Sequence, residues 1–156
     1  VPMIMNVNKI DAGQSFDYYM EGITPSIARM AEKVDAERIA LAKKLGIDVA
    51  STAQSVINGY GSHGENLYEV IQTTQAYVGI QSPSSLAHRF CHEDTFGSLV
   101  GFATLAKELG VPTPGMDAVI TCISMATGID YFTVGRTAQK VGLTGKSVDE
   151  IYEMIR

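Results

Sequence analysis

The sequence predicts an all-α fold, and two features of its pattern carry this prediction. Apolar residues recur at three- and four-residue spacing in several stretches, and capping residues stand at the ends of those stretches. Strand-like alternation occurs only in residues 1–7 (VPMIMNV), where we expect one short strand. The chain of 156 residues is long enough to bury a core, and no period repeats along it. We therefore expect a single multi-helix domain over residues 1–156.

The longest helix is expected between Thr24 and Gly46. Thr24 is a favourable N-cap residue, Pro25 suits the first helical position, and Gly46 ends the run. A weaker helix should follow at about 49–58, and helical turns within 66–78. A short helix should begin behind Pro83 with a serine N-cap. The apolar stripe of the long helix, which should face the core, consists of Ile27, Met30, Ala31, Val34, Leu41 and Leu45.

Two strongly apolar helices should form the centre of the domain. The first lies within 96–114 and ends at Gly110 and a turn with two prolines. The second, within 115–130, is apolar almost all round, so we expect both helices to be buried. Near the end of the chain, Ser147 followed by Glu150 matches a capping box, which predicts a final helix.

Composition and charge narrow the classes of function. The net charge is −5, with both signs interspersed and no basic block, which argues against a nucleic-acid partner. No apolar run reaches the roughly 18 residues that cross a membrane. Cys91 and Cys122 are not spaced as a disulfide framework and indicate free thiols in a reducing, cytoplasmic compartment. The start, without Met or a signal segment, is interpreted as a cut inside a longer protein.

A glycine-rich stretch, residues 59–64 (GYGSHG), fits the dinucleotide-binding pattern G-x-G-x-x-G. Such a site requires a strand before the glycines, a helix starting on them and an acidic residue about 20 positions later. Here a helical pattern precedes the glycines, and Ser-Pro-Ser-Ser stands where the acid should be. We therefore expect a loop and no cofactor site.

The stretch 84–96 (SSLAHRFCHEDTF) is the most chemically loaded part of the chain. On a helix His88, Cys91 and His92 share one face, and their ligand types suit zinc. A closed zinc site needs a fourth ligand, whereas His63 is the only other histidine, and the arrangement H-E-x-x-H is absent. We expect no metal here.

Arg89 and Asp94 suggest a different site in the same stretch. An arginine suits a carboxylate ligand, and an aspartate can hold the tautomer of a histidine and stabilise its protonated form. Five residues on an unbroken helix set these side chains about 140° apart. Both therefore face one pocket only if the helix begun at Ser84 ends before Asp94, or if a ligand fills the gap. Asp94 as the N-cap of a next helix, near Gly97, and a simple salt bridge stay open as alternatives.

Five segments in order resemble the C-terminal helical domain of the octopine/nopaline (opine) dehydrogenase family: FDYYMEGITPSIARMAEKVDAERIALAKKLG, YG, LYEVIQTTQAYVGIQSPSSLAHRFCHED, LAKELGVPTP and GIDYFTVGRTAQKVGLTG. The resemblance implies an all-α domain of the 6-phosphogluconate-dehydrogenase C-terminal-like type, preceded by a Rossmann domain that this chain lacks. That missing domain would bind most of the NAD or NADP. The implied reaction joins the amine of an amino acid to a 2-oxo acid and reduces the imine, or runs the reverse oxidation; a homodimer is left open.

The resemblance also implies roles for two residues. Arg89 would clamp the carboxylate of the 2-oxo acid, and Asp94 would orient a catalytic histidine that donates and accepts a proton. In the family this histidine precedes the FxYYxEG segment, whereas this chain has none before His63, so we expect it upstream of Val1. The chain alone should then be folded but catalytically silent. A structural role, as an ion pair or as exposed charge, is expected for Asp35, Glu37, Arg38 and Arg136.

A rival hypothesis from another class is a non-catalytic helical module that binds a partner or dimerises. Its support is that the two apolar helices could form an interface as readily as a core.

Overall fold

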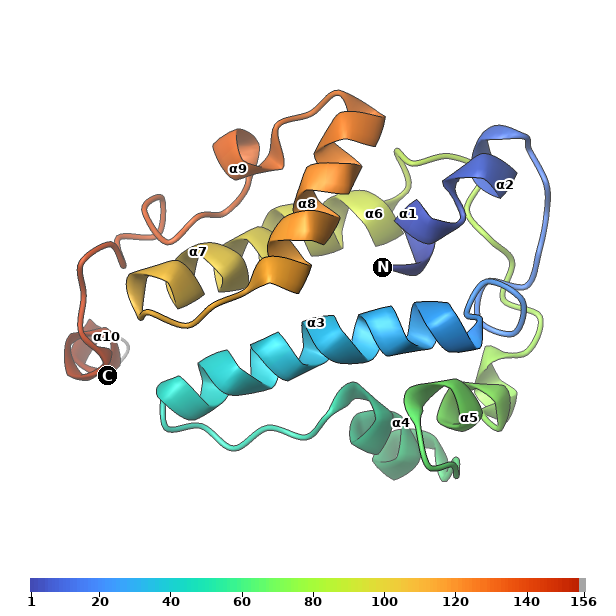
Figure 1. Ribbon diagram of the computed structural model, residues 1–156, viewed down its shortest axis with the longest axis horizontal. Coiled ribbons are helices and arrows are strands. Elements are labelled where there is room, and N and C mark those ends of the chain that lie inside the picture. The colour runs from blue at the N-terminus through green and yellow to red at the C-terminus, as the bar shows by residue number, and fades with distance from the viewer. Residues whose placement is uncertain (155–156) are drawn as a thin grey trace.

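The computed structural model describes residues 1–154, and these form helices and loops without a named strand. The prediction of an all-α fold is confirmed (Figure 1). In chain order the helices are α1 (Pro2–Met5), α2 (Val7–Asp11), α3 (Pro25–Lys44), α4 (Thr52–Tyr60), α5 (Leu67–Gln72), the 3₁₀ turn η1 (Gln75–Tyr77), α6 (Arg89–Glu93), the π-wound η2 (Asp94–Leu99), α7 (Val100–Glu108), α8 (Pro114–Thr127), α9 (Tyr131–Val134) and α10 (Val148–Met154).

The predicted strand over residues 1–7 is wrong, because these residues form α1 and the start of α2. Pro2 occupies the first turn of α1, where its missing N–H costs nothing. Between the two helices, the buried Asn6 amide donates to the Pro2 carbonyl (2.9 Å) and to the Gly22 carbonyl (2.8 Å). Alternation of apolar and polar residues over only seven positions cannot by itself distinguish a strand from a helix. In the described residues, no partner strand pairs with this segment.

The long helix α3 begins and ends as predicted. The Thr24 hydroxyl accepts a hydrogen bond from the Ile27 amide, and Gly46 follows the last turn with a φ of +75°. Ile27 and Leu41 are buried as expected, but Met30 is 46% exposed. Met30 lies about 60° around the helix from Ile27, at the edge of the stripe, where the neighbouring helices do not cover it.

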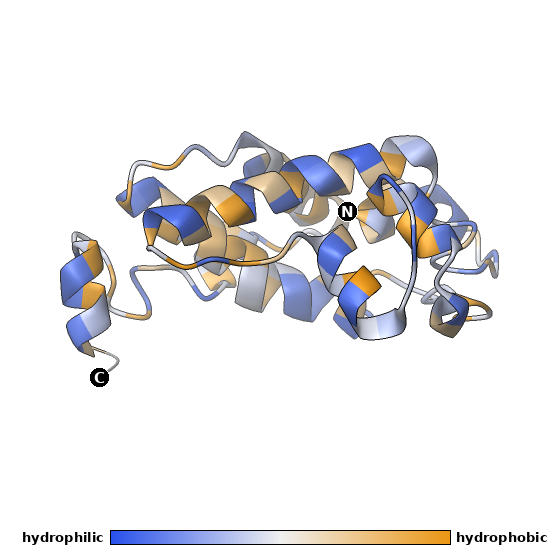
Figure 2. Ribbon diagram, turned by 90° about the horizontal axis from the view of Figure 1, so that it is seen from below, coloured by the Kyte–Doolittle hydropathy of each residue, from blue (hydrophilic) through white to orange (hydrophobic). Residues whose placement is uncertain are grey.

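The two apolar helices α7 and α8 each bury one face in the main core, but they are not buried all round as expected, since Phe102 of α7 and Met125 of α8 are exposed. Val100, Ala106 and Ile120 are 0% exposed, and Met116 is 1% exposed. Helix α3 lies between this pair and the smaller helices α4 and α5 (Figure 1), with a second cluster of apolar side chains on the α4–α5 side. Figure 2 shows hydrophilic and hydrophobic residues alternating along the helices, as amphipathic elements require.

Glu37 of α3 caps the start of α8, which sequence reasoning did not foresee. Its carboxylate accepts hydrogen bonds from the amides of Gly115 (2.7 Å) and Met116 (2.8 Å). Glu37 is therefore neither an ion-pair partner nor a free surface charge, whereas Arg38 pairs with Asp35 at 2.7 Å as expected. The carboxylate satisfies amides at a helix N-terminus, where negative charge is favoured.

Residues 61–64 of the glycine-rich stretch lie in the loop between α4 and α5, as predicted, whereas Gly59 and Tyr60 are the last residues of α4. Gly61 ends α4 in the left-handed conformation, and the chain then passes through Ser62, whose hydroxyl lies 2.7 Å from the Thr74 hydroxyl. Helix α4 itself runs over Thr52–Tyr60, a few residues later than expected.

The capping box at the last helix is confirmed. The Ser147 amide donates to the Glu150 carboxylate (2.8 Å), and the Glu150 amide donates to the Ser147 hydroxyl (3.3 Å). Helix α10 lies at one end of the molecule in both ribbon views (Figures 1 and 2). Among the helices of residues 1–154, none has the length and apolar character to cross a membrane.

Candidate functional site around Asp94

The predicted helix from Ser84 is wrong, because α6 begins only at Arg89. The preceding segment is tied to the start of the chain: the Ser82 amide donates to the Phe16 carbonyl (2.8 Å), and Gln81 bridges to Asp17. These long-range bonds hold the chain extended up to Ser82. His88 then serves as the N-cap of α6, its ring nitrogen accepting from the Phe90 amide at 3.3 Å.

The helix does not end before Asp94, contrary to the expectation for a shared pocket. It passes from α6 into the π-wound η2 and then into α7, with Asp94 itself helical at φ −66° and ψ −37°. Arg89 and Asp94 therefore stay about 140° apart around the axis. The N-cap interpretation of Asp94 is also wrong, because a continuous helix offers no free first turn there.

Arg89 is a solvent-exposed side chain that pairs along its own helix. Its guanidinium lies 3.4 Å from the carboxylate of Glu93, and both side chains are largely exposed. Within residues 1–154 no ion pair joins Arg89 to Asp94. The cation is thus already opposite a carboxylate, which a ligand carboxylate can replace.

The three residues considered for zinc have separate roles. His88 caps α6, Cys91 is buried at 1% exposure, and the Nδ1 atom of His92 lies 2.8 Å from the Tyr131 hydroxyl. Burial raises the pKa of the Cys91 thiol, so this side chain behaves as part of the core. In the described part of the chain, no three side chains of metal-binding type converge.

Asp94 lies beside a pair of tyrosines that the sequence did not single out. Burial raises the pKa of both Tyr18 and Tyr19, and the negative charge of Asp94 raises it further. The Asp94 carboxylate therefore lies close enough to Tyr18 and Tyr19 for its charge to act on their hydroxyl groups.

These tyrosines belong to a continuous set of aromatic rings, which we call the aromatic run. Tyr18 contacts Tyr19 and Phe90 with ring centroids 5.1 and 5.5 Å apart. Tyr19 stacks on Tyr77 at 4.1 Å, and Tyr77 contacts Tyr60 at 5.2 Å. Burial, with the neighbouring Tyr60 and Tyr19, raises the pKa of Tyr77 to about 12. The run extends from α6 to α4, so one wall beside Asp94 is aromatic and uncharged.

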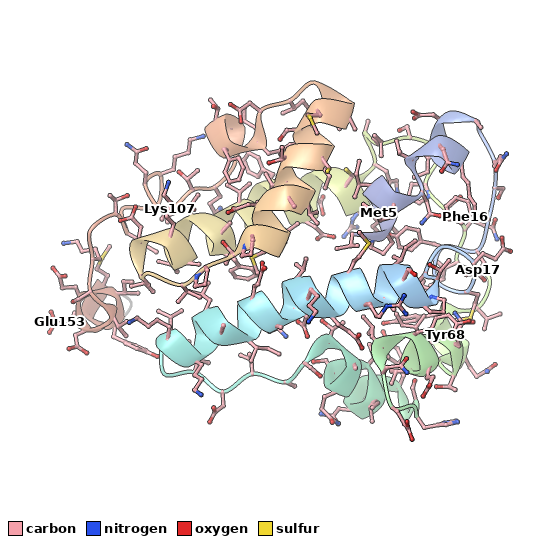
Figure 3. The ribbon with its side chains drawn as sticks, in the orientation of Figure 1. Met5, Phe16, Asp17, Tyr68, Lys107 and Glu153 are labelled. Carbon is pink, nitrogen blue, oxygen red and sulfur yellow. The ribbon has the colours of Figure 1, made fainter. Side chains whose placement is uncertain are left out.

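Asp17 fixes the loops that carry this aromatic run (Figure 3). Its carboxylate accepts from the amides of Tyr19 (3.2 Å), Met20 (2.9 Å) and Gly79 (2.6 Å), which joins two loops far apart in sequence. Burial acts to raise the pKa of Asp17, but the three amide hydrogen bonds hold it below its ordinary value. The carboxylate is thus ionised in its structural role.

Two hollows of the surface lie outside the aromatic run. One of about 640 Å³ lies between α7, α8 and α9 and includes Lys107 and Asp117. Lys107 is at the opposite end of the molecule from Asp17 (Figure 3). A smaller hollow of about 370 Å³ is lined by His92 and Tyr131. Asp94 lines neither of these hollows and lies on the exposed surface of the domain.

A sequence profile described as NAD/NADP octopine/nopaline dehydrogenase, alpha-helical domain, matches residues 1–127. The chain belongs to this family. The opine dehydrogenase of Arthrobacter sp. (strain 1C) is 41% identical over 145 residues, which make up 93% of this chain and 40% of that protein. Protein ocs of Agrobacterium tumefaciens (strain Ach5) is 27% identical over 134 residues, or 86% of this chain and 37% of that protein.

A solved structure of octopine dehydrogenase, described with NADH and L-arginine, has the same fold as this opine dehydrogenase domain. The TM-score is 0.76 at 20% identity, over 96% of this chain and 45% of the other. The fold class implied by the family resemblance is thereby confirmed. The chain spans less than half the length of the relatives that it matches.

Proposed function

We propose that this chain is the substrate domain of an NAD- or NADP-dependent opine dehydrogenase that works in the cytoplasm. The whole enzyme would condense an amino acid with a 2-oxo acid and reduce the product, or oxidise it in reverse. The observation that carries this proposal is the 41% identity to a protein named opine dehydrogenase, which extends over 93% of this chain. A Rossmann domain preceding residue 1 in the same polypeptide would hold the nucleotide.

The cofactor does not fit the residues of this chain. Within residues 1–154 the G-x-G-x-x-G stretch links two helices, and the required strand is absent. The nucleotide, bound upstream, would supply the hydride that reduces the imine carbon. The residues of this chain would bind and orient the substrates and help to move the proton.

Arg89 would bind the carboxylate of the 2-oxo acid. Its exposure and its single long contact to Glu93 leave the guanidinium free to form a paired hydrogen bond with a ligand. Because Arg89 and Asp94 point about 140° apart, they cannot hold the same small group. The substrates would lie across the exposed side of α6 and fill the gap between the two residues.

Asp94 would orient and stabilise a histidine contributed from upstream of Val1. It is exposed, and within residues 1–154 its carboxylate accepts no hydrogen bond from another residue. Helix α1, at the start of the chain, contacts α6, so a residue entering from before α1 would come near this helix. A carboxylate beside a histidine fixes its tautomer and favours its protonated form. That histidine would donate a proton to the substrate nitrogen when the imine is reduced, and it would accept the proton from that nitrogen in the reverse oxidation.

The test is to restore the upstream region and to follow NAD(P)H oxidation with amino acid and 2-oxo acid together. Arg89→Ala should raise the KM for the 2-oxo acid about 10- to 100-fold, since a hydrogen bond to a charged group is worth about 1.5–3 kcal/mol. Asp94→Asn should lower kcat by up to about 10⁴-fold. Arg29→Ala, which removes an arginine of α3, is the matched control. Near-wild-type kinetics in both site variants would contradict these roles.

The rival hypothesis of a non-catalytic helical module is not favoured. The most buried apolar residues of α7 and α8, on which it rested, are packed into the core. The relatives that cover most of this chain include a protein named opine dehydrogenase and one named vitopine synthase.

A further inference from the structure

The continuous helix from α6 to α7 has a buried stripe with one irregular step. The stripe passes through Cys91, Thr95, Val100, Ala103 and Ala106, each at most 3% exposed. The steps along the sequence are four, five, three and three residues. The five-residue step falls in η2, where the helix is π-wound and the Val100 amide donates to the Thr95 carbonyl. The π turn thus keeps one face buried on both sides of it.

Without the π turn, the two parts of the helix could not both keep their present faces. An α-helix turns by about 100° per residue, so a single extra residue rotates everything before it by about that angle relative to α7. If η2 relaxed to α winding while α7 stayed in the core, Arg89 and Asp94 would point in other directions. The direction of both site residues therefore depends on η2.

Two contacts outside the backbone ladder hold η2 in this form. The buried Thr95 hydroxyl donates to the Cys91 carbonyl at 2.6 Å, one turn earlier in the helix. The Phe96 carbonyl accepts a hydrogen bond from the amide of Arg136 at 2.9 Å, although Arg136 lies forty residues later. Hydroxyl bonds to a carbonyl four residues back are known to bend helices, and π turns need such outside partners for carbonyls.

Residues 135–138 (GRTA), which we call the clamp, run close along the helix. The Ala138 amide donates to the Thr104 hydroxyl at 2.8 Å. At Gly135 the approach is so close that a Cβ would lie 2.9 Å from a Val100 methyl group and 2.5 Å from the Tyr131 carbonyl oxygen. The contact at η2 therefore requires glycine, which gives the GRT motif a structural purpose that the exposed Arg136 side chain does not explain.

We propose that the clamp and Thr95 are positioning elements of the active site, because they stabilise the π turn that sets the directions of the Arg89 and Asp94 side chains. The inference rests on the proposed function of those two residues. Thr95 and Gly135 act through the backbone of η2 and contact no substrate. Their loss should disturb the alignment of the site more than the stability of the domain.

The experiment uses the enzyme with its upstream region restored and four variants. Thr95→Val removes the hydroxyl, Thr95→Ser keeps it, and Gly135→Ala pushes the clamp away from η2. The matched control is Thr127→Val, since the Thr127 hydroxyl makes the same kind of bond to Ile123, at 2.8 Å, in α8. Each protein is measured for kcat, for the KM of the 2-oxo acid, for melting temperature and for hydrogen exchange of the Val100 amide.

Thr95→Val and Gly135→Ala should speed exchange at Val100 and lower kcat by about 10²-fold, the size of effect seen when a site is misaligned by about 1 Å. Thr95→Ser should restore both values, and Thr127→Val should change neither, even with a similar fall in melting temperature. Unchanged exchange at Val100, or losses of kcat no larger than those of Thr127→Val, would overturn the inference. A wild-type enzyme without amino-acid-dependent NAD(P)H oxidation would instead contradict the proposed function. The exchange rates of the Val100 amide would still show whether Thr95 and the clamp stabilise the π turn.

Discussion

Single residues near Asp94 show what the sequence could and could not reveal. Arg89 and Asp94 stood out by residue type, but their proposed roles came only from the family resemblance, because their spacing alone allows a cap or a salt bridge. Tyr18 and Tyr19 carried no signal of their own, since a tyrosine pair in a loop is common. Their place beside Asp94 depends on Asp17, which bonds to Gly79 sixty-two residues away. No local pattern predicts such a contact.

Glu93 should compete with the substrate for Arg89. The two exposed side chains lie 3.4 Å apart, so under the proposed role of Arg89 the Glu93 carboxylate would occupy the position of the 2-oxo acid carboxylate. Exposed ion pairs contribute about 0.2–1 kcal/mol, so Glu93→Gln should lower the KM for the 2-oxo acid about two- to fivefold without changing kcat. Steady-state kinetics against Glu65→Gln, a distant change of equal charge, measure the effect. A higher KM in Glu93→Gln would contradict the competition.

Asp17→Asn should destabilise the domain in a pH-dependent manner. An amide side chain places a donor opposite the Gly79 amide, a loss of about 1–3 kcal/mol at neutral pH. The folded-state pKa of Asp17 is below its ordinary value of 3.8, so the stabilisation is present above that value and disappears as the pH falls through the lower folded value. Urea unfolding at neutral and strongly acidic pH measures the difference, with Asp48→Asn as control. An effect independent of pH would contradict this account.

At the scale of elements, helix ends with local caps were predictable and those fixed at a distance were not. Thr24 and Ser147 form the expected caps because the bonded partners are three residues away. The helix expected at Ser84 does not form, because Ser82 is held extended by Phe16. The π turn could not be predicted from the sequence either. The buried stripe that reveals it depends on the packing of α8 and the clamp against the helix.

The capping of α8 by Glu37 gives a prediction for a whole element. Thr113, the N-cap residue of α8, makes no side-chain bond to the first turn, and Glu37 supplies two bonds instead. Glu37→Ala should therefore lower the free energy of unfolding by about 1–2 kcal/mol, as the loss of a helix cap does. Denaturant unfolding beside Lys33→Ala, a neighbouring exposed change on α3, tests this. Equal stability of the two variants would show that the cap is not needed.

At the scale of the whole molecule, the fold class followed from hydrophobic pattern because the two most apolar segments had to be central. The layers on either side of α3 could not be predicted, since they depend on which face of each short helix meets which neighbour. The resemblance supplied the domain type, and the 0.76 TM-score confirms it.

The product of the full-length enzyme tests the central claim most directly. The protein with its upstream region is incubated with NAD(P)H, an amino acid and a 2-oxo acid, and the product is identified by mass spectrometry. Reductive condensation predicts a secondary amine with the combined composition of both substrates less one oxygen atom, formed only when both are present. A hydroxy acid formed from the 2-oxo acid alone would contradict the claim, as would the absence of any product linked to NAD(P)H oxidation.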